Sequence, residues 1–347
     1  MQFTDSSTGM PTAWAWEFEG GDPATSTDQN PSVTYAMAGT YTVTLTVTND
    51  DGSDEEIKMD YVTVTNPILV PVSEFSASQT TITSGNEITF TDESTNEPTS
   101  WSWEFEGGSP ATSTEQNPTI SYNNFGTYEV TLTATNSAGS DVETKTGYIT
   151  VNMQTATYTV TFKGNWSAAN HPTNFPGGNH FSSAVGMVHK PGVTFFEEGE
   201  LASLGIKDMA EQGQNGPIST EIGTLVSNGS ALSYYSGGGL PTGLDEVSFT
   251  ITVNEEFSWV TLVSMIAPSP DWFVAAEDVN LFDNGTFISN LTVDGISYDA
   301  GTDSGPNFTS GNQVTSPAEN ITLITDAPLG NGTTVDPTVA FFIFTKN

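Results

Sequence analysis

Two acidic loops in the C-terminal part of the chain have the residue types that bind a hard cation. They are residues 267–273, with the sequence APSPDWF, and residues 299–305, with the sequence DAGTDSG. Asp299 and Asp303 are four positions apart with a glycine between them, so a tight turn can bring both carboxylates toward one centre. Asp271 can reach that centre from the other loop. Calcium takes several flexible oxygen ligands, including carboxylates and backbone carbonyls, so these residues indicate a calcium site.

A second interpretation of the same loops needs no metal. Asp side chains in Gly-rich turns commonly cap nearby backbone amides and tolerate unusual dihedral angles. The spacing also differs from the twelve-residue helix-loop-helix pattern that is specific for calcium. From the residues alone, a calcium site and a self-capped turn both remain open.

The other candidate groups for chemistry are three histidines and the many carboxylates. His171, His180 and His189 are nine positions apart, whereas zinc ligands usually occur as closer pairs, so structural hydrogen bonding is favoured. The chain has no Cys, no Gly-x-Ser-x-Gly sequence and no phosphate-binding Gly loop followed by Lys. Paired carboxylates are too numerous here to indicate a glycosidase. We predict that the chain is not an enzyme.

The composition is strongly acidic and restricts the partners. The 347 residues include 42 Asp and Glu but only 6 Lys and no Arg, for a net charge of −36. Such a surface repels polyanions, so nucleic acid is a poor partner, and docking on anionic lipid would need bridging calcium. A content of 35% hydrophobic and only 14% charged residues predicts packed domains. No stretch is long and apolar enough for a transmembrane segment.

The N-terminal part contains an internal repeat. Residues 3–65 align with residues 90–152 without gaps, at a constant offset of 87 (90 minus 3), and about two-thirds of the positions are identical. Both copies have aromatic residues at every second position of one strand-like segment: Trp14, Trp16 and Phe18, and then Trp101, Trp103 and Phe105. Alternation of this kind predicts strands with one buried face, so we expect core packing rather than a sugar-binding platform. Residues 41–48, which alternate apolar residues with Thr, predict another such strand.

The order of signals in each copy resembles the PKD repeat. The signals are F-T-D-x-S, W-x-W-E-F-E-G-G, Q-N-P and G-T-Y-x-V-T-L-T, followed by a Gly turn and a final strand. In that family the Trp-led strand usually continues into a Gly-Asp-Gly turn, which here reads EGGDP at residues 19–23 and EGGSP at residues 106–110. The resemblance implies two immunoglobulin-like sandwiches, which we place at residues 1–66 and 72–152.

The first copy lacks the leading segment of the second. Residues 73–85 precede Phe90 in the second copy, whereas only two residues precede Phe3 in the first. We therefore expect the first domain to lack its opening strand and the chain to be a C-terminal fragment of a longer precursor. The open edge would be frayed or completed by another segment or chain, which would permit self-assembly through the missing edge strand.

The C-terminal part resembles the spondin N-terminal domain, found in extracellular matrix and adhesion proteins. Five segments carry this resemblance: residues 158–176 (YTVTFKGNWSAANHPTNFP), 180–189 (HFSSAVGMVH), 195–213 (FFEEGELASLGIKDMAEQG), 265–274 (MIAPSPDWFV) and 298–305 (YDAGTDSG). The resemblance implies an eight-stranded antiparallel sandwich with bound calcium over residues 153–347. Its implied calcium ligands at matching positions are Asp271, Asp299 and Asp303.

Two further features of this domain can be predicted. Residues 197–212 indicate the only helix of the chain, ending at Gly213 in a left-handed cap, with five apolar residues covering a sheet end: Leu201, Leu204, Ile206, Met209 and Ala210. Trp272 and Phe273 follow the first acidic loop and are expected in the core, because a strand continues after them.

The sequence as a whole predicts an all-β chain of three tandem antiparallel β-sandwiches. We expect an extracellular segment, secreted or on a cell surface, whose calcium-dependent spondin-type domain binds a carbohydrate, matrix or cell-surface protein and is presented on PKD spacers. One alternative is a non-catalytic accessory region of a secreted hydrolase, and another is a structural subunit of a cell-surface filament. Vertebrate spondin-type proteins contain disulfides, so the lack of Cys favours a bacterial homologue.

Overall fold

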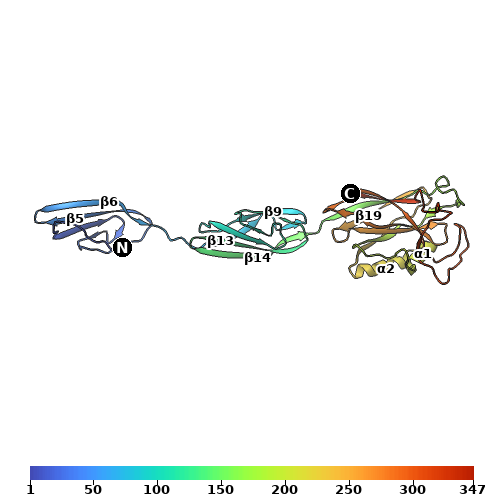
Figure 1. Cartoon of the computed structure of the whole chain (residues 1–347), viewed down its shortest axis with the longest axis horizontal. Helices are drawn as coiled ribbons and strands as arrows, with labels where there is room; N and C mark the ends of the chain where they lie inside the picture. The colour runs from blue at the N-terminus through green and yellow to red at the C-terminus, as the bar shows by residue number, and fades with distance from the viewer. The chain divides into compact units, whose positions relative to one another are not determined.

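The computed structural model describes residues 1–347 and consists mostly of β-strands (Figure 1). The predicted all-β sandwich architecture is confirmed. The chain divides into two compact units, one of residues 1–79, 88–120 and 129–148 and the other of residues 80–87, 121–128 and 149–347. The first unit holds the first repeat and most of the second repeat. The second unit holds the remaining strands of the second repeat and the C-terminal domain.

The first repeat forms one main sheet, in the strand order β3-β1-β5-β6, and a small sheet of β2 and β4. Its strands are β1 (Ala13–Phe18), β2 (Gly21–Asp22), β3 (Thr25–Ser26), β4 (Thr34–Tyr35), β5 (Gly39–Asn49) and β6 (Gly52–Val64). The amino end is ordered against the loop before β4, because the Met1 amino group donates to Val33 O and Phe3 N donates to Pro31 O.

The second repeat forms two sheets, in the strand orders β11-β10-β13-β14-β8 and β12-β9-β7. Its strands are β7 (Phe75–Ala77), β8 (Thr81–Thr83), β9 (Asn86–Asp92), β10 (Ser100–Phe105), β11 (Thr112–Ser113), β12 (Thr119–Tyr122), β13 (Gly126–Asn136) and β14 (Gly139–Asn152). Strands β7 and β8 have no counterpart in the first repeat.

The predicted aromatic core is present in both repeats with almost the same geometry. Trp16 and Phe18 are buried and stack with ring centroids 5.6 Å apart, and Phe3 lies 4.8 Å from Phe18. Trp103 and Phe105 stack at the same 5.6 Å. Alternation along the strand therefore placed these side chains correctly in the core.

The first aromatic residue of each strand has a different role. Trp14 is half-buried, and its indole N–H donates to Asp5 Oδ2 at 2.8 Å. The same carboxylate accepts from Ser7 N and from Gln29 Nε2. In the second repeat Asp92 accepts the equivalent bonds from three donors: Ser94, Trp101 and Gln116. The Asp of the F-T-D-x-S signal thus ties the first strand segment to the Trp-led strand.

Burial of the Thr-alternating strand differs between the repeats. In β13 the apolar residues Val130, Leu132 and Ala134 are all buried. In β5 only Val43 is buried, whereas Leu45 and Val47 are half-exposed. The predicted strand is present in the first repeat, where Tyr41 and Leu45 pack against the core beside Val43 but stay partly exposed.

The C-terminal domain has three layers. Its strands and helices are β15 (Thr155–Gly164), β16 (His180–Phe181), β17 (Val185–His189), α1 (Leu204–Gln212), α2 (Gly216–Ser227), β18 (Ala231–Ser236), β19 (Glu246–Asn254), β20 (Trp259–Ala267), β21 (Trp272–Asn280), β22 (Phe282–Asp283), β23 (Thr286–Phe287), β24 (Asn290–Asp294), β25 (Ile296–Asp299), β26 (Thr322–Leu323) and β27 (Ala340–Lys346). A four-stranded sheet in the order β19-β15-β27-β24 faces a seven-stranded sheet built on β18-β17-β20-β21-β25-β26. The two helices cover the other face of the larger sheet. The resemblance implied eight strands, but short edge pairings such as β16 and β26 raise the number.

The central strands of the larger sheet are buried on both faces. Leu262 and Val274 pack against the smaller sheet in one core, whereas Val263 and Phe273 pack against the helices in a second core. Strands in such positions carry nearly continuous apolar runs rather than alternating ones. The predicted core position of Phe273 is confirmed, and Trp272 is also buried.

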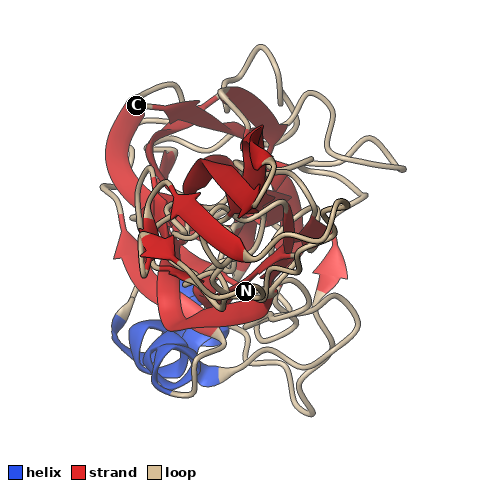
Figure 2. Cartoon of the chain, turned by 90° about the vertical axis from the view of Figure 1, so that its left-hand side faces the viewer, coloured by secondary structure: helices blue, strands red, loops and turns tan.

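The structure has two helices, α1 and α2, where the sequence predicted a single one (Figure 2). Helix α1 starts only at Leu204, because Ser203 is its N-cap and accepts from Ile206 N, and it ends at Gly213 with φ 65°, as predicted. Leu201 and Leu204 are exposed, so they do not cover the sheet. Helix α2 was missed because Gly, Ser and Thr are weak helix formers, although Pro217 at its start and the spacing of Ile218 and Ile222 are helical signals.

We predict that Asp5→Asn destabilises the first repeat at neutral pH by roughly 1 kcal/mol, because an amide cannot accept the bonds from Ser7, Trp14 and Gln29 together. The Ser7 hydrogen bonds, with those from Trp14 and Gln29, lower the pKa of Asp5 to about 2. Because the pKa of Asp5 is lower in the folded than in the unfolded protein, its ionised carboxylate stabilises the fold at pH values above the unfolded pKa. The difference in unfolding free energy between wild type and variant should therefore shrink as the pH falls from about 4 toward 2. Urea unfolding followed by Trp fluorescence measures this. Glu17→Gln, which removes an exposed charge on the same strand, serves as the control, and equal behaviour of both variants would contradict the assignment.

Candidate functional site

The two acidic loops lie at one end of the larger sheet because their strands are paired. The first loop connects β20 to β21, and the second follows β25. Strand β21 pairs antiparallel with β25, which places Trp272 directly opposite Asp299. Asp271, one position before the start of β21, is therefore next to the loop that follows Asp299. Strand pairing brings together two segments about 30 positions apart in the sequence.

Asp271 is buried and is bonded through only one of its two carboxylate oxygens. Its exposed fraction is 0%. Oδ2 accepts from Thr302 N at 2.6 Å, from Thr302 Oγ1 at 3.2 Å and from Asp303 N at 2.9 Å. Oδ1 is buried and has no hydrogen-bond partner. A buried carboxylate oxygen without a partner is costly, so Asp271 is a group that a bound cation would stabilise.

Asp299 is held by the strand opposite and by its own turn. Its Oδ2 accepts from Trp272 Nε1 at 2.9 Å, and its Oδ1 accepts from Gly301 N at 2.8 Å. Gly301 has φ 71°, and a Cβ atom there would lie 2.3 Å from Glu319 O. Only glycine fits this position, which explains why the turn between the two Asp residues contains one.

Asp303 caps the loop that follows it. It is 6% exposed, and its carboxylate accepts from Gly305 N at 2.9 Å and from Gln313 N at 3.1 Å. Both Asp299 and Asp303 thus cap local amides, as the self-capping interpretation predicts. Asp271 differs, since it bonds amides of the other loop and keeps one oxygen free.

The carboxylates of the site influence one another electrostatically. Burial, together with the charge of Asp299, raises the pKa of Asp271 to about 6. Burial also raises the pKa of Asp299, and the charges of Glu319 and Asp303 add to this effect against the hydrogen bonds from Gly301 and Trp272. Like charges in a poorly solvated place disfavour ionisation, so a cation would lower the energy of all these groups.

A hollow of about 540 Å³ opens beside the site, and its lining includes Asp299, Asp303, Glu319 and Trp272. Glu319 was not among the residues predicted from the sequence. It lies in a long irregular segment, where its N donates to Gly301 O. No spacing signal links it to the other acids, so only the folded loop could reveal it.

The carboxylates of the site do not form a complete cage for a metal ion. No group of three or more Asp, Glu or His side chains in the structure is placed to hold a metal ion together. Calcium tolerates mixed shells, in which backbone carbonyls and water complete the coordination. Asp271, Asp299 and Asp303 would supply the charged oxygens of such a shell.

The three histidines are separated and bonded individually. His171 Nε2 contacts Pro337 O, His180 Nδ1 contacts Gly178 O, and His189 contacts both Lys190 O and Thr261 Oγ1. Burial lowers the pKa of His171 and of His189. These contacts support the structural interpretation of the histidines.

The structure contains no helix able to span a membrane. The helices α1 and α2 have 9 and 12 residues.

Comparison with known proteins relates the N-terminal and C-terminal parts of the chain to two different domain families. Residues 156–342 match the model of the Spondin_N family, and residues 1–64 and 70–151 match PKD domain models. Human Spondin-2 is 33% identical over 179 residues, which cover 50% of this chain and 53% of the relative. Chicken (Gallus gallus) Spondin-1 is 34% identical over 180 residues, which cover 49% of this chain and 22% of the relative. The chain thus spans about half the length of Spondin-2 and less of Spondin-1.

Among solved structures, the PKD1 domain of the Vibrio cholerae metalloprotease PrtV is 34% identical to this chain. The match covers 24% of this chain and 99% of that domain, with a TM-score of 0.21. The PKD1 domain of Vibrio anguillarum Epp is 28% identical, also with a TM-score of 0.21, over 24% of this chain and 99% of that domain.

Both domain types are generally non-catalytic, and the relatives make this an extracellular protein, as the sequence predicted. The family model covers more than half of the 347 residues, and the acidic loops fall inside the matched region. The chain therefore belongs to the Spondin_N family and carries PKD domains in its N-terminal part.

Proposed function

We propose that this chain is a calcium-dependent adhesion segment, in which the spondin-type domain binds its partner and the PKD domains serve as spacers. The coarser role, extracellular binding, follows from family membership. The finer role assigns calcium to Asp271, Asp299 and Asp303. The single observation that carries it is the buried, unpartnered Oδ1 of Asp271 beside the second carboxylate, Asp299.

The negative charge of the site carboxylates, which no basic side chain neutralises, supports the proposal of a bound cation. An isolated buried carboxylate costs several kcal/mol unless it is protonated, paired or bound to a metal. None of the four ion pairs of the structure involves a residue of this site, and there is no Arg in the chain. Calcium would provide the missing positive charge and hold the two loops together.

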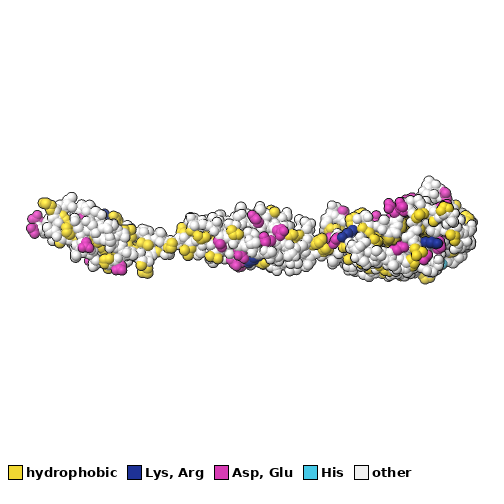
Figure 3. Space-filling model, turned by 90° about the horizontal axis from the view of Figure 1, so that it is seen from below, with side chains coloured by type: hydrophobic (Ala, Val, Ile, Leu, Met, Phe, Trp, Pro, Cys, Tyr) yellow, Lys and Arg dark blue, Asp and Glu magenta, His cyan; other side chains and the backbone are white.

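The neighbouring hollow is the proposed contact surface for the partner. It is lined mainly by polar groups, including Thr315, Thr322 and Thr325 in addition to the acids. The visible surface of the chain carries acidic side chains in many places and few Lys (Figure 3). We therefore favour a carbohydrate, matrix or cell-surface protein partner that meets hydroxyl, carboxylate or calcium groups, and not a polyanion.

No enzymatic activity is proposed. The two domain types found are generally non-catalytic, and the histidines contact backbone carbonyls or Thr261 rather than a nucleophile. The carboxylates of the site are used in loop capping and in the proposed calcium shell.

We predict that millimolar calcium raises the melting temperature of the C-terminal domain by about 5 °C or more, because a ligand that binds only the folded state stabilises it. EDTA should reverse the shift. Differential scanning calorimetry and calorimetric titration of the whole chain measure both effects. An absence of binding heat together with unchanged melting would exclude the calcium site.

The variant Asp271→Asn separates metal binding from loop capping. Its amide oxygen can still accept the bonds from Thr302 and Asp303, so the domain should fold, but the calcium-induced shift should disappear. Asp294→Asn, which removes an exposed carboxylate on β24, should keep the full shift. If Asp271→Asn responds to calcium like wild type, the assigned ligand set is incorrect.

We also predict that the calcium-free wild-type domain loses stability as the pH rises from about 4 to about 6. The folded pKa of Asp271 is about 6 and the unfolded value is close to 3.9, so the folded state binds the proton more tightly in this range. The loss should approach about 3 kcal/mol at most. Urea unfolding in EDTA at several pH values measures it, and a wild-type profile that matches Asp271→Asn would contradict the assignment.

A further inference from the structure

A second hollow of the C-terminal domain lies at the edges of its two sheets. Its volume is about 300 Å³, and its lining comes from the turn between β24 and β25, from residues 323–325 at the end of β26, and from residues 333–338 before β27. Strand β24 is the outermost strand of the smaller sheet, and β26 is the outermost strand of the larger one. We call this space between the sheet edges the edge hollow.

A buried hydroxyl group without a partner lines the edge hollow. Ser297 is 4% exposed, and its Oγ has no hydrogen-bond partner. Ser297 lies opposite Val274, which packs in the core between the sheets, whereas the next residue, Tyr298, packs toward the helices. Strand alternation therefore turns the Ser297 side chain to the same side as the hollow. A buried hydroxyl without a partner is costly, so a ligand that hydrogen-bonds to it would stabilise it.

Hydrogen bonds within the protein already hold the walls of the edge hollow in place. Thr338 Oγ1 donates to Gly295 O at 2.7 Å, and Gly332 N donates to Thr325 O at 2.7 Å. A Cβ atom at Gly295 would lie 2.4 Å from Val274 Cγ2, so the turn can approach the core this closely only with a glycine. A site with ordered walls loses little conformational entropy when a ligand binds.

The lining of the edge hollow combines negative charge with apolar surface. Asp294 and Asp336 are exposed, and neither carboxylate makes an ion pair. The lining includes no Lys. Leu323, Ile324 and Val335 form an apolar wall. These groups suit an elongated apolar group that ends in a positive charge.

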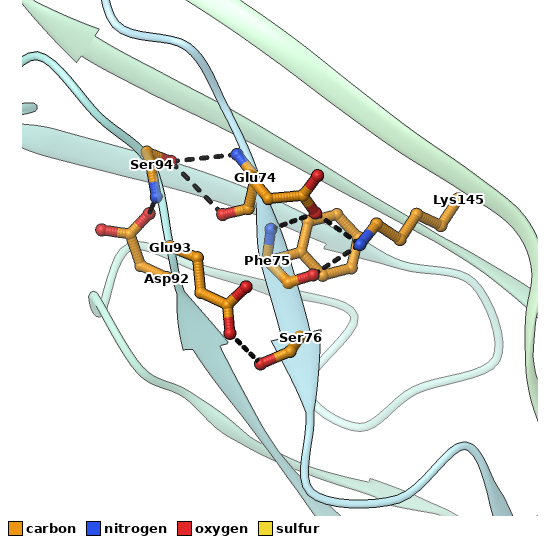
Figure 4. Close-up of polar contacts among 7 residues, drawn as sticks. All are labelled: Glu74, Phe75, Ser76, Asp92, Glu93, Ser94 and Lys145. Carbon is orange, nitrogen blue, oxygen red and sulfur yellow. Dashed lines mark hydrogen bonds and ion pairs between the residues drawn. The ribbon is translucent and has the colours of Figure 1, made fainter.

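The second repeat shows how this chain holds an ammonium group of its own. Lys145 Nζ donates to Glu74 Oε1 and to Phe75 O, both at 2.5 Å, and lies 4.5 Å from the Phe75 ring centroid (Figure 4). A carboxylate, a neutral oxygen and an apolar side chain together surround the cation. The edge hollow offers the same three kinds of group, but no lysine of this chain lies there.

We propose that the edge hollow binds a lysine side chain that a partner protein presents. The aliphatic part of the lysine lies on the apolar wall, and the ammonium group pairs with Asp294 and Asp336 and donates to Ser297 Oγ. An ammonium group has three donors and no acceptor, which matches three groups that can all accept. A lysine side chain also buries its stem while its charged end stays near water, as this open rim requires.

Other ligands fit the edge hollow less well. A neutral sugar would leave both carboxylates without a counter-charge, and the lining has no aromatic side chain on which a sugar ring could stack. A bare metal ion would not contact the apolar wall. Residues 323–325 also line the hollow beside the acidic loops, so a partner bound there can reach the edge hollow. The lysine site itself uses none of the proposed calcium ligands and therefore does not depend on calcium.

The experiment titrates the whole chain in EDTA with Nα-acetyl-lysine-N-methylamide and follows binding by saturation-transfer difference NMR. The dissociation constant should be on the order of 1 mM, because a ligand of this size makes few contacts. The norleucine analogue, which keeps the stem without the ammonium group, should bind at least about tenfold more weakly, since charge-assisted hydrogen bonds are lost. Equal binding of the norleucine analogue, or binding of methyl glucoside in place of the lysine probe, would overturn the proposal.

The variant Ser297→Ala distinguishes a binding role from a structural one. Removing a buried hydroxyl that has no partner should leave the melting temperature unchanged or raise it, whereas the lysine probe should bind about fivefold more weakly. The double variant Asp294→Asn, Asp336→Asn should weaken the probe at least about tenfold. Asp283→Asn, which removes an exposed carboxylate on β22, is the matched control and should bind like wild type.

The calcium site and the lysine site can be tested separately. Asp271→Asn should lose the calcium-induced shift in melting temperature but keep the lysine affinity. Asp294→Asn should keep the calcium-induced shift but bind the lysine probe more weakly. The lysine proposal is overturned if wild type shows no saturable binding, or if Ser297→Ala and the double variant both bind the probe like wild type.

Discussion

The end of the C-terminal sandwich depends on one carboxylate that has no exposed atom. One oxygen of the Asp271 carboxylate accepts hydrogen bonds from the backbone amides of Thr302 and Asp303. These bonds join the loop after β20 to the loop after β25. Separating the loops would leave those amides without partners in a poorly hydrated place. The second oxygen has nothing to bond, and Asp299 adds a like charge nearby. The same carboxylate therefore joins the loops and is the group for which calcium is proposed, so the structure of this end and its proposed function depend on one side chain.

The position of this carboxylate follows from the layers of the domain. Strands β20 and β21 are buried on both faces, with Leu262 and Val274 in one core and Val263 and Phe273 in the other. Burial of this extent fixes the register of the sheet, because slipping by one residue would exchange the two faces. A fixed register places Trp272 opposite Asp299, and the indole N–H then bonds the carboxylate. The precise loop geometry is thus a consequence of strands that have little freedom to move.

A comparison of the two PKD repeats distinguishes what the local sequence contributes to a hydrophobic core from what distant segments contribute. Their aromatic stacks have matching centroid distances, and Asp5 and Asp92 accept the same set of hydrogen bonds. Leu132 is nevertheless buried while its counterpart Leu45 is not. The sequences around the two Leu residues are nearly the same, so the difference comes from tertiary packing and not from the strand itself. The alternation of apolar and polar residues predicts which face of a strand is apolar, but only packing against another part of the fold can bury that face.

By itself, the sequence determined the strand patterns, the repeat, the left-handed cap at Gly213 and the acids that are candidates for calcium. These features depend on side-chain periodicity or on glycine conformation, which act over a few residues. The tertiary structure alone decided that α2 is helical, since its weak helix formers are stabilised by burying Ile218 and Ile222. It also decided that Glu319 joins the site and that one oxygen of Asp271 lacks a partner. Each of these depends on distances between segments far apart in the sequence, which pairing and packing set and local patterns do not encode.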